Sequence, residues 1–279
     1  MTTSLQNTVD ALLQDRSLRE PDQLARRIDA LDRLEAWLVY DESSLESSLC
    51  QRANAVMAEW EAINEQLFQS IRDDIRQGSG AKSLCDWAEA LRQQDRAERY
   101  DPLDALVAGV LNFEAPGDVS ELANEMVFYQ PTPARHIFDF IARAQLDERD
   151  VVMDLGSGLG HVALLTAICT PARCIGIELE HAYVVSARQC AQALNIGRAS
   201  FIAQDVRATD LSEGSVFYLY TPFTGTLLRS VLDDLRRQAE RRTIRLWTLG
   251  PCTTVIANEP WLVTEDHGDT HRVSVFQSR

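Results

Sequence analysis

A glycine-rich segment with an internal carboxylate carries the most informative chemistry in the sequence. An apolar run that begins at Val151 leads into Asp154. Three glycines follow at alternate positions: Gly156, Gly158 and Gly160. Glycine there lets the backbone turn sharply and lets a ligand lie directly against it. The spacing is GxGxG rather than the GxGxxG of dinucleotide folds, since His161 stands where the next small residue is sought. Asp154 would oppose a pyrophosphate, so the segment favours a ligand with positive charge.

Two further carboxylates follow later strand-like runs. Glu178 ends the run that starts at Arg173, and Asp205 follows the run over 200–203. A carboxylate at the tip of a second strand can accept both hydroxyls of a ribose through its two oxygens. Asp205 could accept from an adenine amino group, with the Val206 amide alongside. Each acid alone could be a solvated strand end, but three in order indicate one binding edge.

The sequence pattern around these acids predicts an α/β fold. Short β-rich runs alternate with helical ones and are expected at 150–155, 173–177, 200–203, 215–220 and 243–249. Such alternation predicts a doubly wound parallel sheet covered on both faces. Two last runs, 261–264 and 272–276, are joined by a turn-rich segment and predict a C-terminal antiparallel hairpin. The prediction is therefore a Rossmann-like sheet of seven strands.

The part of the chain before this alternation reads as all-α. Apolar residues at helical spacing predict one long amphipathic helix over 43–77, opened by a Ser43–Glu46 capping box. Shorter helices are expected around 24–38 and 84–91 and from Pro102 onward. The turn-forming stretch 112–118 is the best boundary. We therefore expect a helical domain over 1–115, acting as cap or dimer surface, and a second domain over 116–279.

Composition excludes several classes of function. The 279 residues carry a net charge of −15, of which −14 lies in residues 1–150. Such an acidic chain without a basic run is a poor candidate for binding nucleic acid. The sequence contains neither a membrane-spanning apolar run nor a secretory signal, so a cytoplasmic location is expected. Its six cysteines form no CxxC pair, and no metal-ligand spacing or Ser-His-Asp order emerges. No metal site is expected.

The strand tips and glycine motif resemble the class I S-adenosylmethionine-dependent methyltransferases over about residues 120–279. The resemblance implies S-adenosyl-L-methionine as cofactor and a last strand inserted antiparallel. It also implies that Asp154 and the three glycines hold the methionine part of the cofactor. Glu178 would then hold the ribose, and Asp205 with Val206 the adenine.

A shorter motif indicates one group within this family. The run Phe128-Tyr-Gln-Pro-Thr-Pro133, together with Asp-Leu-Gly-Ser-Gly, looks like the non-SET protein lysine methyltransferases of the silencing-disruptor and ATP-synthase c-subunit types. In these a loop before the first strand closes over the cofactor, which implies cofactor contacts for Tyr129 and Thr132. The alternative is a plain turn in which Thr132 caps a helix with Pro133 at its first position. Without basic segments, a chromatin substrate is not expected.

The fourth strand-like run ends where this family positions the acceptor. Its tip reads Tyr220-Thr221-Pro222-Phe223 and lacks the amide or acid that base-methylating enzymes carry there. Tyr220 and Thr221 are candidate catalytic residues that orient a nucleophile, and the candidate acceptor contacts are Tyr220, Pro222 and Phe223. The alternative is a packed strand end. His161 could touch the cofactor, or could cap or pack.

The sequence therefore predicts a methyltransferase that transfers a methyl group in line, with a protein side-chain nitrogen preferred as acceptor. A small molecule methylated on nitrogen or oxygen is the alternative acceptor. A non-catalytic binding module and a dinucleotide oxidoreductase are the alternatives from other classes. The long helix over 43–77 could serve a homodimer.

Overall fold

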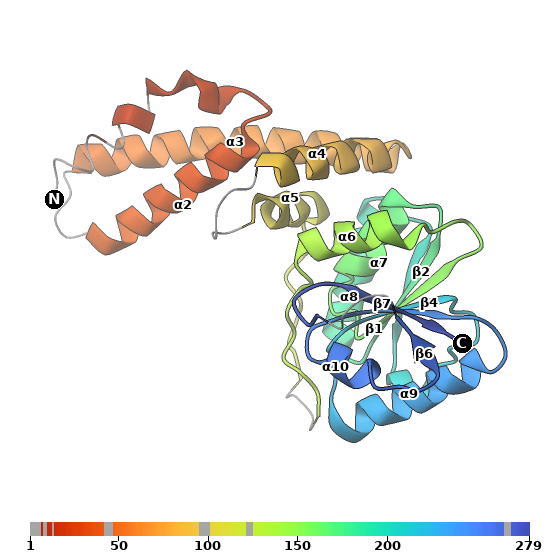
Figure 1. The fold of residues 1–279 in the computed structure, drawn as a ribbon. Coiled ribbons are helices and arrows are strands. Elements are labelled where there is room, and N and C mark those ends of the chain that lie inside the picture. The colour runs from red at the N-terminus through yellow and green to blue at the C-terminus, as the bar shows by residue number, and fades with distance from the viewer. Residues whose placement is uncertain are drawn as a thin grey trace.

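The computed structural model describes residues 7, 10–12, 14–41, 47–94, 101–120, 125–264 and 269–279. The N-terminal part is helical, as predicted (Figure 1). Its elements are η1 (Arg16–Arg19), α2 (Leu24–Asp41), α3 (Ser47–Arg76), α4 (Gly80–Gln94) and α5 (Pro102–Leu111). The long helix α3 confirms the amphipathic pattern, and it ends before Gly78, whose φ is +83°. The predicted capping box at Ser43 and Glu46 lies outside the described residues.

The C-terminal part contains the predicted sheet. Its strands are β1 (Val151–Leu155), β2 (Arg173–Glu178), β3 (Ala199–Ala203), β4 (Val216–Tyr220), β5 (Arg245–Leu249), β6 (Leu262–Val263) and β7 (Ser274–Ser278). Among the described residues these form one seven-stranded sheet in the order β3-β2-β1-β4-β5-β7-β6. The first five are parallel, whereas β7 runs antiparallel to both β5 and β6. The inserted antiparallel strand and the final hairpin confirm the expected topology, and β3-β2-β1-β4-β5 is the doubly wound arrangement.

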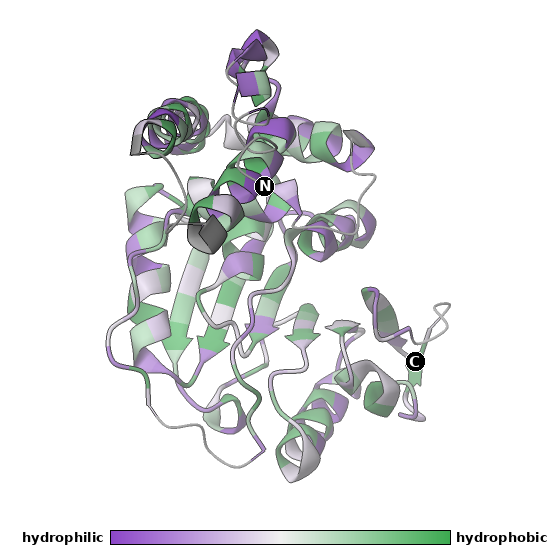
Figure 2. Ribbon diagram, turned by 90° about the vertical axis from the view of Figure 1, so that its left-hand side faces the viewer, coloured by the Kyte–Doolittle hydropathy of each residue, from purple (hydrophilic) through white to green (hydrophobic). Residues whose placement is uncertain are grey.

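Helices cover both faces of the sheet. On one face lie α6 (Ala134–Ala144), α7 (His161–Cys169) and α8 (His181–Ala193); on the other lie α9 (Gly225–Ala239) and α10 (Cys252–Ile256). Successive side chains of β1 point alternately to these two faces. Val152 belongs to the cluster under α6–α8, and Met153 and Leu155 to the cluster under α9 and α10. The strands are coloured as mostly hydrophobic in Figure 2, as expected when both faces are covered.

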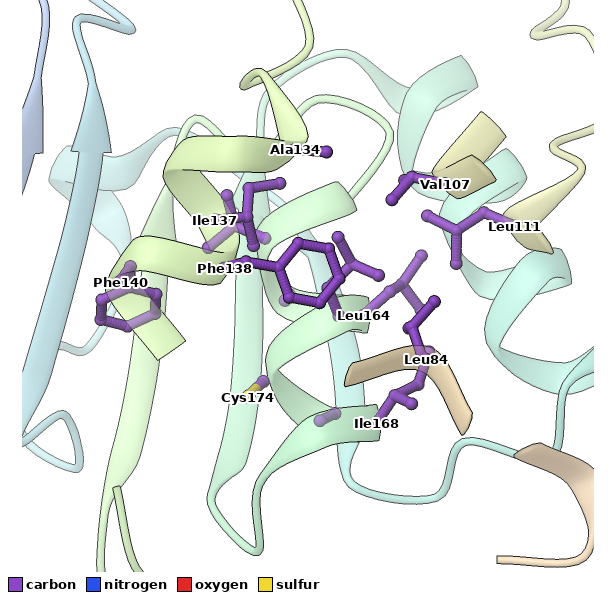
Figure 3. Packing of buried hydrophobic residues seen from close by; sticks show 14 of the residues in the cluster. Leu84, Val107, Leu111, Ala134, Ile137, Phe138, Phe140, Leu164, Ile168 and Cys174 are labelled. Carbon is purple, nitrogen blue, oxygen red and sulfur yellow. The ribbon is translucent and has the colours of Figure 1, made fainter. Parts of the chain in front are cut away.

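The N-terminal helices share the hydrophobic core of the sheet domain. Leu84 on α4 and Val107 and Leu111 on α5 lie beside Leu164 and Ile168 on α7 (Figure 3). A separate small core lies farther out, between η1, α2 and the first half of α3, and contains Leu18, Leu34, Leu49 and Trp60. The 30-residue helix α3 therefore packs against different elements along its length: its first half against η1 and α2, and its last turns in the core shared with the sheet domain.

No helix in the described part of the chain is long and apolar enough to span a bilayer.

Candidate functional site

The turn after β1 is built by glycines in the left-handed region. Gly156, Gly158 and Gly160 have φ values of +82°, +52° and +85°. The amides of Gly156 and Ser157 donate to the Ile177 carbonyl at 2.8 and 3.0 Å, which attaches the turn to β2. Gly160 then caps α7. Only glycine adopts such a succession without strain, so the sequence dictates a tight backbone turn at the carboxyl end of the sheet.

Glu178 holds this turn from the tip of β2. Its Oε2 accepts from the Gly158 amide at 2.8 Å, and its Oε1 accepts from the Glu180 amide at 2.9 Å. The side chain is buried. A carboxylate oxygen has two acceptor positions, so each oxygen of Glu178 keeps one for a ligand hydroxyl. The predicted ribose acid therefore lies beside the middle glycine.

Asp154 is a buried carboxyl beside the same turn. Only 4% of the residue is exposed. Burial, and secondarily the charge of Glu178, raises the pKa of Asp154 to about 8. A carboxyl in this state gains from a cationic ligand, because a nearby positive charge favours its ionised form. Asp154 thus fits the cationic methionine end of the predicted cofactor.

The loop before α6 lies against the glycine turn. Val127 donates to the Pro222 carbonyl at 3.3 Å, and Met126 forms an antiparallel bridge with Phe223. Tyr129 then turns inward: a β-carbon on Gly158 would lie 2.0 Å from the Tyr129 ring. The ring is thus packed directly on the middle glycine, which brings together two predicted cofactor residues that are 29 positions apart.

Upstream, Glu125 anchors this loop to the start of α9. Its carboxylate accepts from the Thr226 amide at 3.2 Å and the Leu227 amide at 3.0 Å. The Thr226 hydroxyl donates to it as well, at 2.7 Å, and this bond is the main cause of the lowered pKa of Glu125. Free amides at a helix N-terminus attract a carboxylate, so α9 fixes where the loop begins.

Thr132 lies near Tyr218 rather than at a helix cap. The N-cap of α6 is Pro133, which has no side-chain cap bond, so the alternative in which Thr132 caps this helix is wrong. The hydroxyl of Tyr218 is buried and has no hydrogen-bond partner of normal geometry within the described residues. Tyr218 was not singled out from sequence. Its position two residues before Tyr220, on the same face of β4, was the available signal.

The tip of β4 differs from the sequence expectation at two residues. Thr221 has φ +40°, and its hydroxyl donates to the Leu249 carbonyl at 3.0 Å while accepting from the Cys252 amide at 3.1 Å. The hydroxyl is therefore occupied, which argues against the predicted catalytic role. Phe223 is buried in the core under α9, so it does not face an acceptor as predicted. Both residues instead shape the strand end.

Pro222 and Tyr220 remain at the edge of the site. A β-carbon on Gly156 would lie 2.2 Å from Pro222, so this proline packs on the first glycine. Tyr220 is half-buried and lies 3.5 Å from the β-carbon position of Gly250.

Asp205 follows β3, as predicted, but its carboxylate is paired. Its Oδ1 accepts from the Arg207 amide at 2.9 Å, and the Arg207 guanidinium contacts both carboxylate oxygens. The Arg207 side-chain hydrogen bond is the main cause of the lowered pKa of Asp205. The neighbouring Val206 side chain is buried in the core. Asp205 therefore lies at the expected strand tip. It pairs there with Arg207, two residues later, which sequence reasoning did not single out.

The geometry fits the cofactor that the sequence predicted. Three left-handed glycines let other groups lie directly against the turn, and a buried carboxyl with a raised pKa lies beside them. Buried polar atoms without partners normally mark strain or an absent ligand. The hydroxyls of Ser157 and Tyr218 belong to this class within the described residues. The same part of the chain holds no group of three or more His, Cys, Asp or Glu side chains arranged for a metal.

Comparison with known proteins agrees with this assignment. The profile of a family described as "Histone methylation protein DOT1" matches residues 124–218, about a third of the chain. The match begins just before the Tyr129 loop and ends on β4. A search of curated proteins finds no significant match.

Solved structures with a similar fold include several methyltransferases. An RNA methyltransferase from Salinibacter ruber, in complex with S-adenosyl-L-homocysteine, is 24% identical with a TM-score of 0.44 and covers 53% of this chain and 92% of its own. Precorrin-6y C5,15-methyltransferase from Geobacter metallireducens is 15% identical with a TM-score of 0.41, covering 57% and 93%. A methyltransferase from Geobacter sulfurreducens, also with S-adenosyl-L-homocysteine, is 20% identical with a TM-score of 0.35, covering 42% and 48%.

The sheet order, the glycine turn and the family match together identify a class I S-adenosylmethionine-dependent methyltransferase domain that resembles the DOT1 family over residues 124–218.

Proposed function

We propose that this enzyme methylates a side-chain nitrogen of a protein, with the amine of lysine as the favoured acceptor. The observation that carries the proposal is the packing of Tyr129 on Gly158, because it places the loop shared with lysine methyltransferases directly on the cofactor turn. The DOT1 match over the same loop and turn supports it. The bound cofactor supplies a methyl group on a sulfonium, a good leaving group for an amine lone pair attacking in line.

We propose that the residues around the turn each bind a different part of the cofactor. Asp154 takes the cationic methionine end, and Glu178 takes the ribose hydroxyls through its free acceptor positions. The backbone of the turn at Gly156, Gly158 and Gly160, which carries no β-carbon, is proposed to line the path between them.

Asp205 and the Val206 amide are proposed to hold the adenine, with Arg207 beside them. Arg207 contacts both oxygens of the Asp205 carboxylate, so an adenine amino group would use the remaining acceptor positions.

At the acceptor end, Tyr220 and Pro222 are the proposed contacts, while Tyr129 and Thr132 are proposed to contact the cofactor. A lysine must lose its proton before it attacks, and a site with little water favours the neutral amine. The chain's own contribution is then positioning, which can supply much of the rate of a bimolecular transfer.

We propose that residues 1–115 form an accessory helical unit and that residues 116–279 carry the chemistry. The acidic excess of the first half would attract a cationic acceptor protein. The outer helices α2 and α3 are the candidate surface for a homodimer. A cytoplasmic location is proposed because all six cysteines are free thiols.

The test is to incubate the protein with a lysate and radiolabelled S-adenosyl-L-methionine, then separate protein from small molecules. Label in protein, recovered as methyl-lysine after acid hydrolysis, is the expected result. The control is Asp154→Asn, which should transfer no label. Label found only in small molecules would contradict the protein acceptor. Binding of the cofactor without any transfer would indicate a non-catalytic module.

A further inference from the structure

Four ring side chains gather around the cofactor turn from separate segments of the chain. They are Phe113, just after α5; Tyr129, in the loop before α6; His161, the first residue of α7; and Tyr183, on α8. The ring centroids of Phe113 and His161 lie 4.7 Å apart, and those of Tyr129 and Tyr183 lie 4.9 Å apart. The Tyr129 hydroxyl lies 3.3 Å from His161 Nδ1 and joins the two pairs into one cluster.

The protonation states set the direction of this hydrogen bond. Burial lowers the pKa of His161 to about 4, so the imidazole is neutral at physiological pH. Burial also raises the pKa of Tyr129 well above its usual range, so the phenol keeps its proton. We assign the tautomer that carries the imidazole proton on Nε2, in which the Tyr129 hydroxyl donates and Nδ1 accepts.

This bond fixes the part of the loop that touches the turn. The ring edge of Tyr129 would lie within 2.0–2.9 Å of a β-carbon on Gly158, while its neighbours Phe128 and Gln130 are exposed. Tyr183 packs on the ring as well. Tyr129 is thus the inward-facing residue of this stretch, and its hydroxyl end is oriented by His161.

We propose that His161 is a positioning residue for the cofactor, acting through the Tyr129 hydroxyl to hold the loop on the glycine turn. The inference rests on the proposed cofactor contacts of the turn. Phe113 fixes the His161 ring in turn, which connects the segment after the N-terminal helices to the cofactor site. The neutral acceptor nitrogen is the essential feature, so a side chain with a suitably placed oxygen should replace it.

The test is a double-mutant cycle on the binding of S-adenosyl-L-homocysteine by calorimetry, which requires no acceptor. His161→Phe keeps the ring contact with Phe113 but removes the acceptor, and Tyr129→Phe removes the donor. Each single variant should weaken binding about five- to tenfold, typical for loss of one hydrogen bond. The double variant should be no weaker than Tyr129→Phe alone, because the hydroxyl through which His161 acts is already absent in that variant. His161→Asn should recover most of the affinity, and His271→Phe, at an exposed position, should bind like the wild type.

The outcomes separate the inference from the proposed function. Additive losses in the double variant, or no recovery by His161→Asn, would overturn the positioning role while leaving cofactor binding intact. The melting temperature checks that His161→Phe is folded; if it is not, His161→Ala takes its place in the same cycle, because it also removes the acceptor nitrogen. If the wild type itself binds no S-adenosyl-L-homocysteine, the cofactor assignment fails first.

Discussion

Asp154 and Tyr218 are register partners on the neighbouring parallel strands β1 and β4, and both side chains are buried on the same face of the sheet. Phe140 of α6 covers the Tyr218 ring, with centroids 5.2 Å apart. Within the described residues the Tyr218 hydroxyl has no hydrogen bond of normal geometry. A buried hydroxyl without a partner beside a buried carboxyl is costly to folding, and a ligand that pairs with both would explain the arrangement.

The stability of the protein should fall with rising pH because of Asp154. Its pKa is about 8 in the folded protein against 3.8 for an unperturbed aspartate, so between these values the folded state holds a proton that the unfolded chain has lost. Stability therefore decreases as pH rises through this interval and levels off above about pH 8. Asp154→Asn is neutral at every pH and should melt about 5 °C or more above the wild type at pH 8.

Thermal melts at pH 4–9 without ligand measure this difference. It should shrink toward zero near pH 4, and the exposed control Asp118→Asn should follow the wild type throughout. Parallel curves for the wild type and Asp154→Asn would contradict a raised pKa at Asp154.

Tyr218→Phe should separate stability from function. Removing a buried hydroxyl without a partner leaves the packing against Phe140 intact, so the melting temperature should stay equal or rise. If the hydroxyl serves a ligand, turnover or cofactor affinity should fall about tenfold, the effect of one lost hydrogen bond in a buried site. A drop in melting temperature with unchanged binding would show that the hydroxyl is structural.

Gly158→Ala should strongly weaken cofactor binding. Its φ of +52° disfavours alanine, and the new β-carbon would lie 2.0 Å from the Tyr129 ring. The turn or the tyrosine must move, and we expect at least a tenfold loss of S-adenosyl-L-homocysteine affinity by calorimetry. Gly197→Ala is the matched control, because nothing lies within 4 Å of its β-carbon position. Equal affinity in both variants would contradict the packed turn.

Cys85 should be the most reactive thiol. A hydrogen bond from the Cys169 thiol lowers the pKa of Cys85 to about 7, whereas burial raises the pKa of Cys174 and Cys190 to about 12. Iodoacetamide at pH 7.5, followed by peptide mapping, should therefore modify Cys85 first, because the thiolate is the nucleophile.

The control for this thiol is Cys169→Ala, which removes the hydrogen bond and should slow the alkylation of Cys85 several-fold. Faster labelling of the half-buried Cys50 in the wild type would contradict the prediction.

Sequence reasoning succeeded where a periodic pattern fixes the geometry. Strand–helix alternation requires the carboxyl ends of the parallel strands to share one edge, so the acids at 154, 178 and 205 had to meet there. It failed at the tip of β4. The left-handed φ of Thr221 turns the chain, so the hydroxyl bonds to backbone and Phe223 points into the core, and neither can be deduced from residue type.

Contacts between distant segments were also beyond sequence reasoning. Tyr129 and His161 are 32 positions apart, and their meeting depends on how the loop before α6 crosses the turn. Likewise, the helical spacing of Leu84 and Leu111 predicted a buried face but not its partner, which proves to be α7. The pairing of Asp205 with Arg207 is local and could have been anticipated from their separation of two residues.

Calorimetric titration of S-adenosyl-L-methionine into the wild type and Asp154→Asn tests the central claim most directly, with NADH as a second ligand. We predict one site in the wild type, at least tenfold weaker binding to Asp154→Asn, and no binding of NADH. No binding of S-adenosyl-L-methionine to the folded wild type, or tight binding of NADH in its place, would contradict it.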